Sequence, residues 1–266
     1  MSKTGPELFD LFKKHKLKIV IEGQTFYVVE GDLLLDEQQL LVYAFQRAEI
    51  EAAADTNKLA EERKGLVGIA DDNGHIVRWK KGLTLTYAVL KNTFGIDQYK
   101  TVVDAMHIAT AGWEAVCDVK FQHLEHWDEG GASQPQIPLF AVQQAPINNN
   151  LIALAFFPNE AVSRRKIYIY PTFFSPNLGY AKEGVLRHEL GHVLGFRHEH
   201  IRSGAPPDCR DEPLDHTIYL TQYDPQSVMH YFCGGVGTRE MAITELDRQG
   251  ARYVYGPPDY EVTYCE

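Results

Sequence analysis

The sequence HELGHVLGFRHEH, which begins at His188, constrains this chain more than any other stretch. His188 and His192 are four residues apart, so a helix places both imidazoles on one face, one turn apart. Glu189 lies beside them, and Gly195 tolerates the positive φ that lets a helix end abruptly. The turn at this glycine lets the chain reverse, so that His198 can approach the imidazoles of His188 and His192. The spacing therefore predicts a three-histidine metal site on a helix.

Three nitrogen ligands leave one position of a tetrahedral zinc ion open, which is typical of catalytic rather than structural zinc. In such a site zinc lowers the pKa of a bound water to about 7. Glu189 is placed to take the proton of that water during attack on a carbonyl and to pass it to the leaving amine. We therefore expect one zinc ion and hydrolytic chemistry. The competing interpretation is an amphipathic helix that carries solvated histidines.

A second motif, YDPQSVMHYF, runs from Tyr223 to Phe232. HExxHxxGxxH followed by a methionine turn is the metzincin signature. The HEH after the glycine turn, together with SVMHY, resembles the astacin family of zinc endopeptidases. The resemblance implies an α+β domain with a twisted mixed sheet, an active-site helix, a methionine turn and a C-terminal helix. It also implies that Met229 forms an apolar floor under the ligands, that Tyr231 is an additional zinc ligand and stabilises the tetrahedral intermediate, and that Glu199 anchors the mature N-terminus.

The resemblance extends over most of residues 78–266. RWKKGLTLTYAV is similar to the first strand of astacins, and LIALAFFP, from Leu151 to Pro158, to their substrate-binding edge strand. The residues of LIALAFFP are more similar to the corresponding strand of the matrixins, a sister family. Astacins often prefer acidic residues after the cleaved bond, and Arg239 could supply the matching charge or be a solvated loop arginine. The substrate-binding residues expected on the edge strand are Ala153, Leu154 and Ala155.

The first 69 residues are extra to a metzincin catalytic domain, so we expect a pro-segment at 1–69 and the catalytic domain at 70–266. Val29-Glu30-Gly31-Asp32-Leu33 resembles the FxGDI-type motif of astacin pro-segments, in which the aspartate binds zinc in place of the catalytic water. The resemblance thus implies that Asp32 is a metal ligand in a latent form only, until proteolysis between about Arg63 and Ala70. The alternative is an ordinary Gly-Asp turn between a strand and a helix.

Four cysteines fit two disulfides and an oxidising compartment, or four buried thiols in a cytosolic protein. No CxxC pair is present, which argues against a cysteine-only zinc site. The resemblance implies that Cys117 pairs with Cys265, which leaves Cys209 and Cys233 as the expected second pair. We therefore expect a secreted or periplasmic protein, although the start, MSKTGPELFDLFKKHK, has no apolar stretch of signal-peptide type.

The order of predicted elements is a mostly β half, a central helix, and an irregular half that ends in a helix. This order indicates an α+β class. Helices are expected at 36–64, 97–116 and 181–194 and from Thr244, and strands at 18–29 (two, with a turn), 83–90, 118–124, 138–142, 151–156 and 166–170.

The formal net charge of −10 argues against nucleic acid as a partner, and no apolar run approaches a membrane span. Protein or peptide substrates and a monomer are expected. Two other functions stay open: a matrixin-like peptidase, suggested by LIALAFFP, and a zinc-bearing binding protein without catalysis, against which Glu189 argues. No GxSxG motif supports a serine hydrolase. His123 and His126 are interpreted as surface residues, and His200 and His230 as non-ligands.

Overall fold

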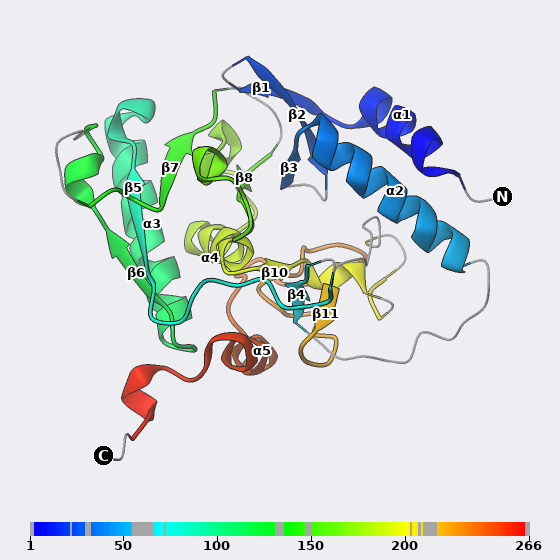
Figure 1. The fold of residues 1–266 in the computed structure, drawn as a ribbon. Helices are drawn as coiled ribbons and strands as arrows, with labels where there is room; N and C mark the ends of the chain where they lie inside the picture. The colour runs from blue at the N-terminus through cyan, green and yellow to red at the C-terminus, as the bar shows by residue number, and fades with distance from the viewer. Residues whose placement is uncertain are drawn as a thin grey trace.

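The structure is a computed structural model of the 266-residue chain (Figure 1). It describes residues 3–21, 23–29, 33–54, 66–71, 73–130, 136–146, 151–202, 204–206, 209 and 217–263. The α-helices are α1 (Gly5–His15), α2 (Glu37–Ala54), α3 (Ile96–Glu114), α4 (Lys182–Val193) and α5 (Glu245–Tyr255). The strands are β1 (Lys18–Ile21), β2 (Gln24–Val29), β3 (Leu33–Leu35), β4 (Val67–Ile69), β5 (Thr84–Val89), β6 (Lys120–His123), β7 (Phe140–Gln144), β8 (Ala153–Leu154), β9 (Lys166–Ile169), β10 (Phe196–Arg197) and β11 (Thr217–Tyr219).

The main sheet has five strands in the order β6-β5-β7-β9-β8. The first four strands are parallel to their neighbours, and β8 runs antiparallel to β9 at one edge. Parallel strands are covered on both faces, so they consist largely of apolar residues, as the buried β5 and β9 do here. Helices α3 and α4 lie against each other beside this sheet (Figure 1), and their apolar sides form the main core with it. The predicted α+β class and mixed sheet are confirmed.

A small antiparallel sheet, β10-β4-β11, lies beyond the end of α4. Its central strand β4 pairs with Phe196–Arg197, the two residues between the glycine turn and His198. Leu66, just before β4, is fully buried in the main core. The sequence did not predict this strand, because three residues are too few to show a periodic pattern.

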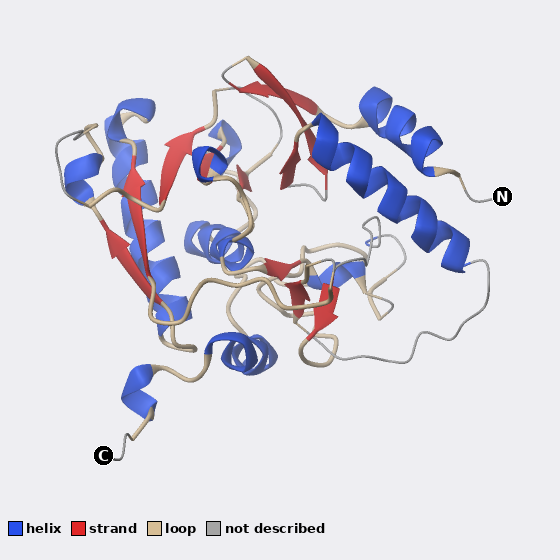
Figure 2. Cartoon of the chain, in the orientation of Figure 1, coloured by secondary structure: helices blue, strands red, loops and turns tan. Residues whose placement is uncertain are grey.

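The N-terminal part forms a unit of its own, with α1 and α2 side by side and the meander β1-β2-β3 next to them (Figure 2). It packs on the edge of the main sheet: Ile19 and Phe26 share a buried cluster with Leu154 of β8 and Tyr168 of β9. Arg164 reinforces this contact through an ion pair to Asp36 of the N-terminal part. A second ion pair, to Glu160, holds Arg164 within its own loop. The boundary between residues 69 and 70 stays a prediction.

Several sequence expectations need correction in extent. The expected strand at 151–156 contains only the two residues of β8, and the expected strand at 138–142 lies at 140–144. The helix expected over 36–64 is described as α2, and 55–65 lies outside the described residues. Helix α1 was not predicted, although Thr4 and Glu7 form a capping box with proline in the first turn, which is a recognisable start signal.

Candidate metal centre

Helix α4 carries the first two histidines one turn apart. Its last carbonyls are satisfied by side chains from distant segments, since Trp79 Nε1 donates to Val193 O (2.7 Å) and the Tyr255 hydroxyl to Leu194 O (2.6 Å). Gly195 then adopts φ +93, as the sequence predicted, and its ideal Cβ position lies only 2.8 Å from Val77 O. The chain can therefore reverse here and enter β10, which leads directly to His198.

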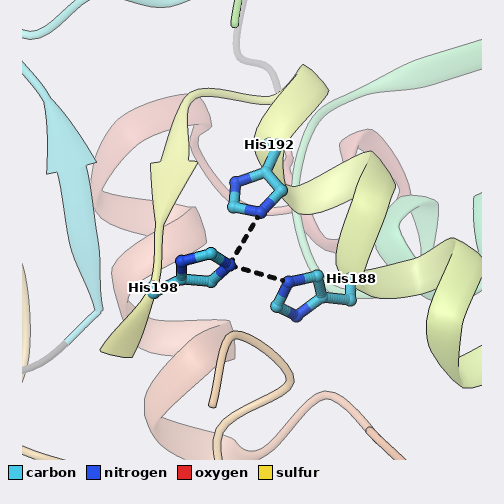
Figure 3. A group of neighbouring side chains, drawn as sticks. All are labelled: His188, His192 and His198. Carbon is cyan, nitrogen blue, oxygen red and sulfur yellow. Dashed lines mark hydrogen bonds between the residues drawn. The ribbon is translucent and has the colours of Figure 1, made fainter. Parts of the chain in front are cut away.

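The three histidines converge as predicted (Figure 3). Nε2 of His198 lies 3.2 Å from Nε2 of His188 and 3.2 Å from Nε2 of His192. All three side chains are buried, at 0–1 % exposure. A tetrahedral zinc ion with Zn–N bonds of about 2.0–2.1 Å places its nitrogens roughly 3.3–3.4 Å apart. The two distances from His198 Nε2 are therefore close to the spacing that such an ion requires.

The protonation of two rings also fits a metal. His188 Nδ1 lies 2.7 Å from Val228 O, and His192 Nδ1 lies 2.8 Å from Phe196 O. A carbonyl oxygen only accepts, so each Nδ1 carries the hydrogen and each Nε2 presents its lone pair to the centre. Hydrogen bonds from the ring nitrogen that faces away from the metal fix the tautomer of metal-binding histidines. Among the described residues, these three histidines are the group of potential ligands close enough together to hold an ion.

A carboxylate in α5 supports the His188 contact. Asp247 is 1 % exposed, and its Oδ2 accepts from the backbone N of Val228 (2.8 Å) while its Oδ1 accepts from the Ser227 hydroxyl (2.6 Å). Burial raises the pKa of Asp247, and the Ser227 hydroxyl and backbone N–H groups oppose that rise. Asp247 thus holds the backbone on the N-terminal side of Val228, the residue whose carbonyl orients His188. The sequence analysis placed Asp247 only within the last helix, which begins at Thr244.

Replacing Asp247 with asparagine should weaken zinc binding by about 10- to 100-fold, because the turn at Ser227 and Val228, which orients His188, loses one of its two carboxylate acceptors. Competition titration of the metal-free protein with a chromophoric chelator measures this directly. Asp104→Asn, which removes an exposed carboxylate of α3, is the matched control and should bind zinc like the parent chain. Equal zinc affinity of the Asp247→Asn and parent proteins would contradict the role given to Asp247.

The methionine turn lies directly beneath α4. Met229 is fully buried, and an ideal Cβ built on Gly191 would lie 2.3 Å from Met229 Sδ. The absence of a side chain at Gly191 thus allows the sulfur to pack against the helix between the two ligands. The ring of Tyr231 lies 5.3 Å from the ring of His188 and 4.6 Å from that of His198, centroid to centroid. The structure therefore brings Met229 and Tyr231 to the metal centre.

Glu199 is fully buried next to the third histidine. Its Oε1 accepts from Arg202 Nη1 (2.9 Å) and from the backbone N of Asp224 (2.9 Å). Burial raises the pKa of Glu199 to about 8, while the Arg202 guanidinium opposes this rise. Its Oε2 has no hydrogen-bond partner in the part of the chain that the structure describes. The predicted contact with a mature N-terminus stays a prediction.

The remaining histidines need one correction. His123 was interpreted as a surface residue, but its side chain is only 6 % exposed and its Nε2 lies 2.9 Å from Asp128 Oδ2. Asp128 also accepts from Tyr99, so this group is a buried polar network at the far edge of the sheet. His126 is exposed as expected. His200 and His230 are buried near the centre, and neither belongs to the group that could hold a metal.

The disulfide Cys209–Cys233 is present, with a Cα–Cα distance of 5.8 Å, and ties the loop after α4 to the segment that follows the methionine turn. Cys117 is a buried thiol whose Sγ lies 3.5 Å from Trp113 O. Its predicted partner, Cys265, lies outside the described residues, so that pairing stays a prediction. Asp32, the predicted latent ligand, also lies outside them.

A cavity of about 330 Å³ opens beside His188, Glu189 and Tyr231. Its other walls come from the approach to the edge strand, from the first turn of α4 and from the segment after the methionine turn. These lining residues are Leu151, Ile152, Ala153, Tyr180, Val185, Phe232, Cys233 and Met241. Of the predicted substrate-binding residues, Ala153 lines the cavity. Leu154 packs in the cluster shared with the N-terminal unit, and Ala155 lies in the main core.

The features together define a candidate three-histidine metal centre with an adjacent carboxylate and cavity. The sequence matches no protein-family model and no curated protein. Similar solved structures include "Structure of myroilysin", at 16% identity and TM-score 0.48 over 71% of this chain and 98% of that one. They also include "Crystal structure of myroilysin", at 15% identity and TM-score 0.42 over 67% of this chain and 85% of that one. What the chain does is therefore inferred from its own metal centre.

Proposed function

We propose that this chain is a zinc-dependent endopeptidase of the astacin type, made as a latent precursor. The observation that carries the proposal is the convergence of three histidines, with His198 Nε2 at 3.2 Å from Nε2 of both His188 and His192. Glu189 lies on the same helix as the first two, and a cavity opens beside them. Zinc bound there would polarise a carbonyl and lower the pKa of a water ligand. The protein contributes the rest of the chemistry through a few side chains.

Glu189 acts as the general base. It takes a proton from the attacking water as the oxygen adds to the scissile carbonyl, and delivers that proton to the leaving amine when the C–N bond breaks. The Tyr231 hydroxyl donates to the developing oxyanion, a contribution on the order of 3 kcal/mol for a single donor. Strand β8 is the outer strand of the main sheet, next to the cavity. An extended substrate adds to this edge as a further strand.

One feature supports latency of the intact chain. The N-terminal unit packs on β8 and β9, the edge where a substrate would lie. In the proposed precursor, Asp32 occupies the water position on zinc until proteolysis between about Arg63 and Ala70.

The disulfide Cys209–Cys233 is compatible with an extracellular or periplasmic protein. No described helix is long and apolar enough to cross a membrane.

Removal of zinc should abolish cleavage of unfolded protein chains by the proteolytically activated protein. A chelator lowers activity to background, and one equivalent of zinc restores it, because the ligands remain in place. Product formation is followed by mass spectrometry of a denatured protein substrate. Full activity of demonstrably metal-free protein would contradict the proposal. A zinc-loaded, activated protein that binds peptides and leaves them intact would favour the catalytically silent binding protein.

A further inference from the structure

Tyr231 lies outside the helices and strands of the structure, and its backbone is held by two imidazoles. The Nδ1 of His230 lies 2.6 Å from Tyr231 O, and the backbone N of Tyr231 lies 3.4 Å from His200 Nδ1. A carbonyl oxygen only accepts and a backbone N–H only donates, so His230 Nδ1 carries a hydrogen and His200 Nδ1 does not. The two histidines thus bind the peptide groups on both sides of the tyrosine.

The ring of His230 is fixed at its other end by Tyr223. His230 is fully buried, and its Nε2 lies 2.8 Å from the Tyr223 hydroxyl. With the hydrogen on Nδ1, the neutral ring accepts the hydroxyl hydrogen at Nε2. The next residue, Asp224, anchors this segment, because its backbone N donates to Glu199 Oε1 (2.9 Å) and its Oδ2 accepts from the Thr244 hydroxyl (2.6 Å). The orientation of His230 is therefore set by a well-anchored segment.

His200 packs against both the third histidine of the metal centre and the tyrosine. Its side chain is buried, at 2 % exposure. Its ring centroid lies 4.7 Å from that of His198 and 4.8 Å from that of Tyr231, with the ring planes inclined by 25° and 28°. The ring of His230 lies 5.5 Å away on a further side. A change at His200 would therefore shift Tyr231 relative to the metal centre.

The chain after Tyr231 folds back onto the same residue. Gly237 has φ +101, and its ideal Cβ position lies 2.5 Å from Tyr231 O, so a residue with a side chain would not fit there. Arg239, the predicted partner of acidic substrates, is not among the described residues that line the cavity. Its guanidinium instead lies 4.6 Å from the ring centroid of Phe232. This close packing supports the position that the two histidines give to Tyr231.

Tyr231 is the member of this group that reaches the cavity. It lines the cavity beside Glu189, whereas Tyr223, His200 and His230 are not among the described lining residues. These three side chains can therefore affect a substrate only through Tyr231. A hydrogen-bond donor to an oxyanion is effective where it is held at the position of the developing charge, and a displacement of about 1 Å can cost about 100-fold in rate.

We propose that His230 and His200 are positioning residues, which hold Tyr231 where its hydroxyl meets the oxyanion, and that Tyr223 fixes the ring of His230. The inference rests on the proposed endopeptidase activity. It gives a role to two buried histidines outside the group that could hold a metal. If they only stabilised the methionine turn, their loss would lower zinc content and turnover together.

A double-mutant cycle on the activated protein tests the proposal, with kcat per bound zinc and KM for one peptide as the measurements. Tyr231→Phe removes the donor and should lower kcat by about 10²–10³-fold. His230→Ala alone should lower kcat by about 10- to 100-fold, with KM within about twofold and the zinc content unchanged. Added to Tyr231→Phe, it should change kcat by less than about twofold, because the group through which it acts is gone. His200→Ala should behave like His230→Ala in both proteins.

Conservative variants separate the two contacts of the His230 ring. The amide of His230→Asn reaches the place of Nδ1 and keeps a donor to Tyr231 O, whereas the amide of His230→Gln reaches the place of Nε2 and keeps only the contact with Tyr223. The asparagine variant should therefore recover most of the kcat lost in the alanine variant, and the glutamine variant little of it. Tyr223→Phe, which removes one hydroxyl, should lower kcat by about three- to tenfold. His126→Ala removes an exposed histidine and is the control with parental kcat.

The same fold loss of kcat from His230→Ala and His200→Ala in the parent and in the Tyr231→Phe protein would overturn the positioning role. So would an unchanged kcat in Tyr231→Phe, or equal kcat values of the asparagine and glutamine variants. Tyr223→Phe and His230→Asn keep the size of the buried side chains and decide the matter if the alanine variants do not fold. These results would leave the endopeptidase activity in place, whereas a zinc-loaded, activated parent that cleaves no peptide would overturn that activity and this inference with it.

Discussion

Activated Glu189→Gln protein is expected to hold one zinc ion as the parent does and to hydrolyse peptides slower by about 10²–10⁴-fold. The amide keeps the shape and burial of the side chain but cannot take a proton from the attacking water. The three ligands come from other residues, so the metal content should not change. Glu189→Ala should show the same loss, and kcat/KM together with zinc content by atomic emission measures both effects.

The matched control is Glu183→Gln, which removes a carboxylate from the first turn of the same helix. It should leave turnover within about twofold of the parent, since Glu183 is not among the residues that line the cavity. Near-normal cleavage by Glu189→Gln would show that another group takes the proton, and the proposed mechanism would be wrong. Loss of both zinc and activity would assign Glu189 a structural role instead.

The intact Asp32→Ala chain is expected to be active, or to cleave itself rapidly, where the intact parent chain is silent. In the proposed precursor Asp32 supplies the fourth zinc ligand, and its removal returns that position to water. We expect at least a tenfold rise in peptide hydrolysis by the uncut protein. Gel electrophoresis of samples taken during the assay shows whether the chain is still intact. Glu30→Ala, two residues earlier in the same segment, is the control and should remain silent.

The double variant Asp32→Ala, Glu189→Gln separates self-cleavage from a contaminating protease, because it should stay intact and inactive. An intact Asp32→Ala chain as silent as the parent would count against the aspartate as the latent ligand. So would a zinc-bound structure of the intact parent chain with no Asp32 oxygen within about 2.0–2.2 Å of the metal. In either case the packing of the N-terminal unit on β8 and β9 would remain as the basis of latency.

The metal ligands could be predicted because their geometry is local. The spacing of His188 and His192 is one helical turn, and Gly195 with φ +93 determines how the chain returns to His198. The residues that position the ligands leave no such signal. Asp247 acts on His188 through the backbone of Val228, which lies 19 residues earlier in the sequence. Trp79 donates to a carbonyl at the end of α4 that is 114 residues away in the sequence. Contacts over such separations carry no periodicity that a single sequence displays.

The cavity escaped sequence analysis for a related reason. Arg239 was the candidate for substrate charge because the resemblance to astacins implies acidic substrates, whereas most of the lining residues are ordinary apolar ones. Val185 belongs to a helix and Met241 to a loop more than 50 residues later, and only the fold places them together. His123 was placed on the surface because it and His126 do not share a face in a short strand followed by a loop. Its partner, Asp128, lies in that following segment.

Gly191 gives the metal motif a meaning that its usual notation hides. Written HExxH, the motif treats the residue before the second histidine as free, but here any Cβ at that position would overlap the sulfur of Met229. The HExxH helix and the methionine turn, almost 40 residues apart, are therefore not independent. The residue type tolerated at position 191 depends on the side chain present at position 229. A chain that carried a larger residue here would have to move the end of the Met229 side chain or carry a smaller residue in its place, so the two positions should change together.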